Sequence, residues 1–153
     1  ASDVYKRQIL NKRMMHDLRT FVPEISQPFS VFEGGPVDQD RLYYVHSRRE
    51  CIPNSKPISK ELAWGGDFDV ITAMINSGEL SSEDIKFFLG YSGWSCDQLI
   101  DEIKQKTWIV LDNEDKKTNI STSNDASFWK SKMMRLGGRY ILWANSPSNP
   151  QLN

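Results

Sequence analysis

The sequence contains little cysteine, no long hydrophobic run and no excess of one charge. Two cysteines, Cys51 and Cys96, lie too far apart and are too few for a disulfide framework or a zinc site, so we expect a reducing, cytoplasmic setting. The apolar runs at 107–111 and 140–144 have the length of a strand, which argues against a membrane partner. The net charge of −1 lacks the basic excess typical of nucleic-acid-binding proteins, so nucleic acid is not an expected partner.

The first eight residues stand apart from the rest. Residues 3–8 read Asp-Val-Tyr-Lys-Arg-Gln and resemble the translation of a sequencing adapter; the alternative is a genuine polar N-terminus. With the adapter interpretation, residues 1–8 are not native, and residues 9–153 form a single domain that is incomplete at its N-terminus. The length of 153 residues is also typical of one domain.

Alternating apolar and polar residues predict the first half of the fold. In segment 41–47, Leu42, Tyr44 and His46 fall on one face, which is the period of a strand. We expect a strand at 29–33 to form a hairpin with it, around a turn at 38–40. Another short strand is predicted at 58–64.

The second half of the sequence alternates predicted helices and strands. A helix follows Asp67, its expected N-cap, and ends at Gly78. The apolar segment 85–89 predicts a buried strand. A helix is predicted at 96–106 with Ile100 and Ile103 facing inward, and another at 125–136. A strand is expected at 107–111, and a strand or extended segment at 140–144.

Three glycine-centred segments, at 33–37, 64–68 and 88–94, are each flanked by large apolar residues. Gly34-Gly35-Pro36 lacks the lysine of a phosphate-binding loop and the third glycine of a dinucleotide fingerprint. At Gly65-Gly66-Asp67 the carboxylate would repel a phosphate at the helix start, so capping is favoured over anion binding. We interpret these segments as structural turns, and we expect no cofactor.

A catalytic constellation is hard to identify. We find no nucleophile with its base, no paired carboxylates and no set of metal ligands, so neither catalytic nor metal residues are assigned. Cys96 near a helix start could be a reactive thiol, with His16 or His46 as its base. An inert thiol and a hydrogen-bonded structural histidine are the preferred interpretations.

Taken together, these segments resemble the bacterial YqgE/AlgH family. The resemblance runs from residue 9 to the C-terminus and is carried by Gly34-Gly35-Pro36-Val37, the strand ending in His46, Gly65-Gly66-Asp67 and the segment 88–94 followed by Gln98-Leu99. It implies an α+β fold, a mixed β-sheet flanked by helices, that is N-terminally truncated here. Cys96-Asp97 and Ile100 depart from the family pattern. Family members are often labelled transcriptional regulators, and the resemblance implies no enzymatic activity.

The function predicted from the sequence is that of a non-enzymatic, cytoplasmic regulatory or interaction protein with a pocket for a small ligand. Its partner would be another protein or that ligand. A transcriptional regulator and an unrecognised enzyme using His46 or Cys96 are the alternatives. If the glycine turns converge in space, the pocket would be lined by Gly35, His46, Gly66, Asp67, Tyr91, Trp94 and Gln98.

Overall fold

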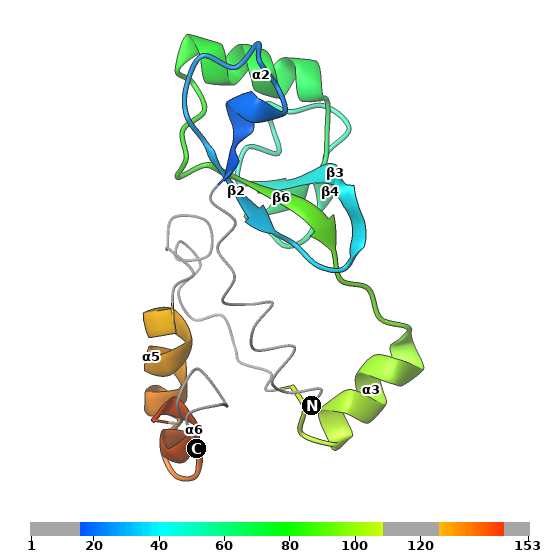
Figure 1. Cartoon of the computed structure of the whole chain (residues 1–153). Helices are drawn as coiled ribbons and strands as arrows, with labels where there is room; N and C mark the ends of the chain where they lie inside the picture. The colour runs from blue at the N-terminus through cyan, green and yellow to red at the C-terminus, as the bar shows by residue number, and fades with distance from the viewer. Residues whose placement is uncertain (1–15, 109–125, 146–153) are drawn as a thin grey trace. The chain divides into compact units, whose positions relative to one another are not determined.

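The computed structural model describes residues 16–108 and 126–145 (Figure 1). The chain divides into two compact units. One, residues 14–122, contains the β-sheet with helices α2 (Phe68–Ser77) and α3 (Cys96–Lys104). The other, which includes residues 123–153, contains helices α5 (Ala126–Leu136) and α6 (Tyr140–Ala144). Among the described residues, no helix combines the length and the apolar character needed to cross a membrane.

The first unit is built on a mixed sheet with the strand order β1-β2-β6-β3-β5-β4 in its described part. β2 and β6 run parallel, and the other neighbouring strands are antiparallel. The strands are β1 (His16–Asp17), β2 (Ser30–Glu33), β3 (Val37–His46), β4 (Lys56–Pro57), β5 (Ala63–Trp64) and β6 (Ile85–Tyr91). Together with the helices, this sheet makes the fold α+β, as the sequence predicts.

The predicted hairpin between 29–33 and 41–47 is wrong, because β6 lies between β2 and β3 in the sheet. The glycine turn after β2 packs against β6. Gly34 donates its N–H to the carbonyl of Leu89, and a Cβ on Gly34 would collide with the carbonyl oxygen of Gly90. Glycine at position 34 therefore allows the backbone to pass close to Gly90 of β6 before the chain enters β3.

The turn predicted at 38–40 is instead a large bulge inside β3. Val37 pairs with Tyr91 and Leu42 pairs with Leu89, so residues 38–41 of β3 lie opposite Gly90 alone. Asp38 has a positive φ of 48° at this point. β3 continues as one strand on both sides of this bulge.

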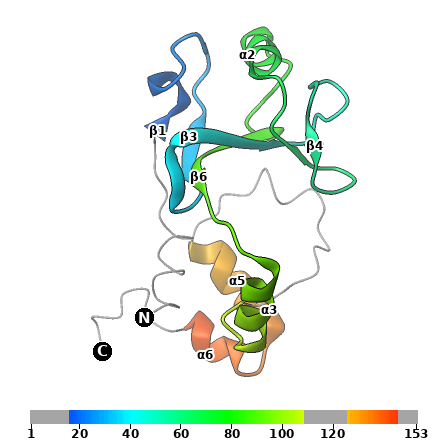
Figure 2. The ribbon, with the colours of Figure 1, turned by 90° about the vertical axis from the view of Figure 1, so that its right-hand side faces the viewer.

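The hydrophobic core lies between helix α2 (Phe68–Ser77) and one face of the sheet (Figure 2). From α2 it receives Ile71, Met74 and Ile75, and the central strand β6 contributes Ile85, Phe87 and Leu89. The segment with the 3-10 helix η1 (Leu18–Thr20) closes the core with Leu18, Ile25 and Phe29. The predicted alternation in β3 is confirmed, since Leu42 and Tyr44 pack against this core and His46 is buried.

Two predicted strands differ from the structure. Within 58–64 only Ala63–Trp64 is a strand, and it pairs with Lys56–Pro57 because the chain reverses through the hydrogen bond from Ile58 N–H to the Leu62 carbonyl. Residues 140–144 form helix α6 (Tyr140–Ala144) rather than a strand. Gly137 and Gly138 both have positive φ and turn the chain there, and their carbonyls accept the first hydrogen bonds of α6.

The remaining helices are close to their predicted bounds. α5 (Ala126–Leu136) corresponds to the predicted helix 125–136, and α3 (Cys96–Lys104) to the predicted helix 96–106. The inward orientation of Ile100 and Ile103 is wrong, because their exposed fractions are 49% and 39%. Of the strand predicted at 107–111, Thr107 and Trp108 do not form a strand, and residues 109–111 lie outside the described residues.

Candidate functional site

His46 is fully buried at the end of β3, and both of its ring nitrogens are engaged. Nδ1 lies 3.2 Å from the backbone nitrogen of Arg48, which can only donate, so Nδ1 is an acceptor without a proton. The proton therefore resides on Nε2, which donates to the carbonyl of Gly65 at 3.0 Å. Ser55 Oγ is 3.2 Å from the same nitrogen and donates its own proton to the carbonyl of Ile52.

This environment keeps the imidazole neutral. Burial lowers the pKa of His46, and the hydrogen bond to Gly65 opposes that shift only in part. Nδ1, the nitrogen that would have to accept a proton in catalysis, already accepts the Arg48 N–H in the protein interior. The arrangement joins the turn after β3 to the glycine turn after β5, as expected of a hydrogen-bonded structural histidine.

The glycine turn that receives this hydrogen bond also starts helix α2. Tyr44 donates its hydroxyl proton to the Gly66 carbonyl at 2.7 Å, and burial raises the pKa of Tyr44, with Asp67 adding to the shift. Gly66 has a φ of 108°, and a Cβ there would lie 2.6 Å from Cγ2 of Ile52. The Asp67 carboxylate accepts the N–H groups of Asp69 and Val70 at 3.1 and 3.4 Å. The predicted N-cap is thus confirmed, and the carboxylate occupies the place of an anion.

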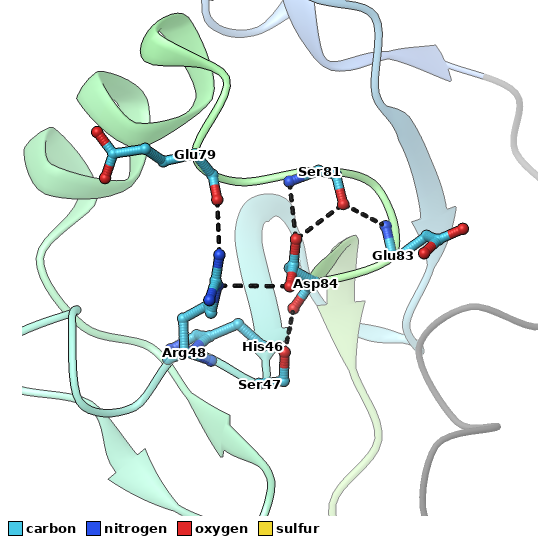
Figure 3. A network of polar contacts seen from close by, with 7 residues as sticks. All are labelled: His46, Ser47, Arg48, Glu79, Ser81, Glu83 and Asp84. Atoms are coloured by element: carbon cyan, nitrogen blue, oxygen red, sulfur yellow. Dashed lines mark hydrogen bonds and ion pairs between the residues drawn. The ribbon is translucent and has the colours of Figure 1, made fainter.

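A polar network that was not predicted from the sequence lies beside His46 (Figure 3). Arg48 donates to the carbonyl of Glu79 at 2.9 Å and pairs with the carboxylate of Asp84 at 3.4 Å. The same carboxylate accepts both the N–H and the hydroxyl of Ser81, and the carbonyl of Asp84 accepts the Ser47 N–H. The network ties the end of β3 to the connection between α2 and β6. No local pattern could reveal it, because its members come from separate segments.

Gly35 and Tyr91 lie together at the other end of β3. A Cβ on Gly35 would collide with the backbone of Tyr91 and with Oγ of Ser92, so the two glycine-rich segments meet here backbone to backbone. The ring of Tyr91 packs edge-on against that of Tyr43, with centroids 5.3 Å apart. These contacts fix the crossing of the two segments.

Trp94 and Gln98 belong to a third group, centred on Glu102 of α3. The indole N–H of Trp94 donates to Glu102 at 3.2 Å, and the amide of Gln98 donates to its other oxygen at 3.1 Å. Trp108, which the sequence reasoning missed, donates to Glu102 at 2.5 Å and packs edge-on against Trp94 with ring centroids 5.2 Å apart. We call Trp94, Gln98, Glu102 and Trp108 the tryptophan bracket, because they join the two ends of α3.

The contacts in the structure therefore place the seven predicted pocket residues in three groups. The first holds His46, Gly66 and Asp67 around the start of α2. The second holds Gly35 and Tyr91, and the third holds Trp94 and Gln98. A pocket shared by all three groups remains a prediction.

A sequence profile described as AlgH-like matches residues 8–141, which is most of the chain. The chain belongs to the AlgH-like family. It is 38% identical over 147 residues to a UPF0301 protein of Bacteroides fragilis and 36% identical over 151 residues to one of Bacteroides thetaiotaomicron. Each alignment covers 95% of this chain and 74% of the relative.

Solved structures confirm the fold of this AlgH-like chain. The solution structure of the AlgH protein from Pseudomonas aeruginosa superposes with a TM-score of 0.64 at 22% identity, covering 90% of this chain and 75% of that one. The crystal structure of protein DIP2367 from Corynebacterium diphtheriae gives 0.63 at 18% identity, with 90% and 73% covered. At such identities the likeness extends to the fold alone.

The two thiols of this AlgH-like protein lie at exposed positions. Cys96 is the first residue of α3, directly after its N-cap Ser95, and Cys51 lies in the turn region after β3. His46, the base considered for a thiol mechanism, has both nitrogens occupied by other groups. Within the described residues, no three histidine, cysteine, aspartate or glutamate side chains come close enough together to hold a metal ion.

Proposed function

We propose that this AlgH-like chain is a non-enzymatic interaction protein of the cytoplasm that binds a protein partner through helix α3. The observation that carries the proposal is the surface of this helix. None of its residues is buried, and Leu99, Ile100 and Ile103 have exposed fractions of 38%, 49% and 39%. Neighbouring aliphatic side chains left open to water are a common mark of a protein interface.

The helix is well defined locally, which suits it to binding. Ser95 caps its start by accepting the Gln98 N–H at 3.2 Å. The tryptophan bracket joins Trp94, before the helix, to Trp108, after it, through the carboxylate of Glu102. Because these contacts hold both ends of α3 in place, the helix backbone would lose little conformational entropy when a partner covers the exposed aliphatic side chains.

The state of His46 supports the non-enzymatic part of the proposal. A general base needs a lone pair within reach of substrate, whereas Nδ1 of His46 accepts a backbone N–H and the residue has no exposed surface. For the enzyme alternative this leaves Cys96. A hydrolase and thiol-reactivity screen would favour that alternative if it found turnover in the wild type that Cys96→Ser removes.

Site-specific photo-crosslinking in the native host tests the proposal. A benzophenone amino acid replaces Ile100 in the α3 surface, and in a matched control it replaces Asp101, whose side chain is 65% exposed. Residues 100 and 101 are neighbours that point to different sides of a helix. We expect a light-dependent adduct of higher mass from position 100 and a much weaker one from position 101. No adduct at position 100, or equal adducts at both positions, would contradict the proposal.

A further inference from the structure

The loop formed by residues 48–55 connects β3 to β4, and we call it the 48–55 loop. Its residue Ile52 has an exposed fraction of 1% and belongs to the hydrophobic core. The Ile52 N–H donates to the carbonyl of Arg48 at 3.1 Å, and the carbonyl of Pro53 accepts the N–H of Asp67 at 2.9 Å. In this closed conformation the loop therefore contributes to the core and is bonded to the start of α2.

The ring of His46 contacts both ends of the 48–55 loop. Nδ1 accepts the N–H of Arg48, the first residue of the loop, at 3.2 Å (Figure 3). Nε2 donates to the carbonyl of Gly65 at 3.0 Å and lies 3.2 Å from the hydroxyl of Ser55, the last residue of the loop. Because the side chain has no exposed surface, these contacts are made inside the protein. One buried imidazole thus holds the loop to the glycine turn after β5.

The closed conformation fits the neutral ring and not the protonated one. An imidazolium carries a proton on each nitrogen, so Nδ1 would direct an N–H towards the N–H of Arg48. The contact at 3.2 Å would then change from a hydrogen bond into a repulsion between two donors. Arg48 can escape this repulsion only by leaving the ring, and the loop begins at Arg48. Protonation therefore favours a conformation in which the loop has moved and water reaches the ring.

The charged groups of the loop and of the neighbouring helix start do not offset this effect. The side chain of Arg48 pairs with Asp84 at 3.4 Å, which occupies the carboxylate closest along the network. Asp67 accepts two N–H groups of α2, and the N-terminus of that helix carries a partial positive charge that disfavours an imidazolium. Arg49 and Glu50 are exposed to water.

The strands around His46 contribute two further titratable groups. Tyr44, on the same face of β3, donates its hydroxyl proton to the Gly66 carbonyl, and burial raises the pKa of this tyrosine, so it stays neutral in acid. Lys86 lies one residue beyond the strand partner of His46, so its side chain is on the opposite face of the sheet. In the described part of the chain the ring thus bonds to a backbone N–H, a carbonyl and a hydroxyl, which supply no counter-charge to an imidazolium.

We propose that His46 is a pH-sensitive switch that keeps the 48–55 loop closed when the ring is neutral and releases the loop in acid. In the released state the ring is in water and has its ordinary pKa of 6.5, whereas the buried ring of the closed state resists protonation. The equilibrium therefore shifts towards the released loop by about tenfold for each pH unit below 6.5, until the pH passes the pKa of the closed state. Release uncovers Ile52, so acid creates a local apolar surface while the sheet stays folded.

Native-state hydrogen exchange of the whole chain, followed by NMR, tests the switch. The reporters are the N–H groups of Ile52 and Asp67, which bond to carbonyls of the loop. The references are the N–H groups of Ile75 in α2 and Phe87 in β6, two fully buried core residues. Rates measured between about pH 7.5 and about pH 5 are divided by the intrinsic exchange rates to give protection factors. We expect the protection of the reporters to fall by about tenfold per pH unit below 6.5.

Low concentrations of urea distinguish release of the loop from unfolding of the domain. Opening of one loop exposes little surface, so exchange at the two reporters should hardly respond to urea. Exchange at Ile75 and Phe87 requires a larger opening, so it should become faster as urea is added. The reporters should also be less protected than the references at every pH.

A pair of histidine variants assigns the pH dependence to one ring. His46→Gln removes the titrating group, and we expect reporter protection in this variant to be independent of pH. His16→Gln changes the exposed histidine and should keep the wild-type dependence. A further readout needs no variant, because the ¹⁵N signals of the wild-type His46 ring should show Nδ1 without a proton at neutral pH.

Each measurement has an outcome that would overturn the switch. Reporter protection that does not change with pH, or that responds to urea as strongly as Ile75 and Phe87 do, would contradict a local release. A proton on Nδ1 at neutral pH, or an unaltered pH dependence in His46→Gln, would contradict the role of His46. The proposed function of α3 is independent of all these results, because the switch does not involve that helix.

Discussion

Replacing His46 by alanine should reveal whether the histidine stabilises the fold or is available for catalysis. The change leaves the N–H of Arg48 and the carbonyl of Gly65 without their partner inside the protein. Each unsatisfied buried group costs about 1–3 kcal/mol, and the space of the lost ring adds about 1 kcal/mol. We therefore expect the free energy of unfolding to fall by about 3–7 kcal/mol, a large part of the stability of a typical domain.

Urea unfolding followed by tryptophan fluorescence measures this loss, with His16→Ala as the matched control. His16 is the other histidine of the chain and is exposed, so its replacement should change stability by less than about 0.5 kcal/mol. If His46→Ala were as stable as the wild type or more stable, the ring would not be a structural element. The interpretation of His46 as a structural, non-catalytic residue would then be refuted.

The same residue predicts a dependence of stability on pH. Because the folded pKa of His46 lies below the unfolded value of 6.5, the unfolded chain takes up a proton first as the pH falls. Stability from this group is complete above pH 6.5 and declines below it, by at most about 1.4 kcal/mol per pH unit, until the pH passes the folded pKa. His46→Gln should remove this part of the dependence. An unchanged pH profile in that variant would show that another group is responsible.

The remaining predictions concern the framework around the site. Asp67→Ala removes the side-chain acceptor for two N–H groups of α2 and should lower the free energy of unfolding, measured in urea, by about 1 kcal/mol. Asp67→Ser keeps an acceptor and should lower it little, so equal losses in the two variants would argue against capping. The added methyl group of Gly78→Ala would meet no neighbouring atom, but residue 78 has a φ of 79°. We therefore expect backbone strain alone to lower the free energy of unfolding by about 1–2 kcal/mol, and no loss of stability would contradict this expectation. Ile71→Ala empties a fully buried position and should lower the free energy of unfolding by about 2–5 kcal/mol; a loss below 1 kcal/mol would place Ile71 outside the core.

Sequence patterns predicted those parts of the fold that depend on neighbouring residues. The start of α2 at Asp67 and its end at Gly78 follow from capping chemistry, and the structure confirms both. The alternation of Leu42, Tyr44 and His46 placed the correct face of β3 inward. In each case the deciding interactions lie within one element or its ends.

Features that depend on distant segments were wrong or missed. The apolar pattern of β6 predicted a buried strand but not its position between β2 and β3, since strand order is set by pairing across the sheet. Residues 140–144 have the composition of a strand, yet the glycines before them start a helix. At the candidate site, hydrogen bonding of His46 was expected, whereas the Arg48–Asp84 pair and the role of Trp108 gave no local signal.

The most direct test of the central claim uses the chain's own thiols as probes of the exposed apolar surface of α3, which Cys96, Leu99, Ile100 and Ile103 form. Cys96 lies within this surface, and Cys51, also exposed, lies outside α3 and serves as the internal standard. Maleimide labelling of the two thiols is compared in intact cells and in dilute purified protein. We predict that Cys96 is labelled several-fold more slowly relative to Cys51 in cells, and that Ile100→Glu abolishes the difference. An identical labelling ratio in cells and in dilute solution would contradict the claim that a partner covers α3.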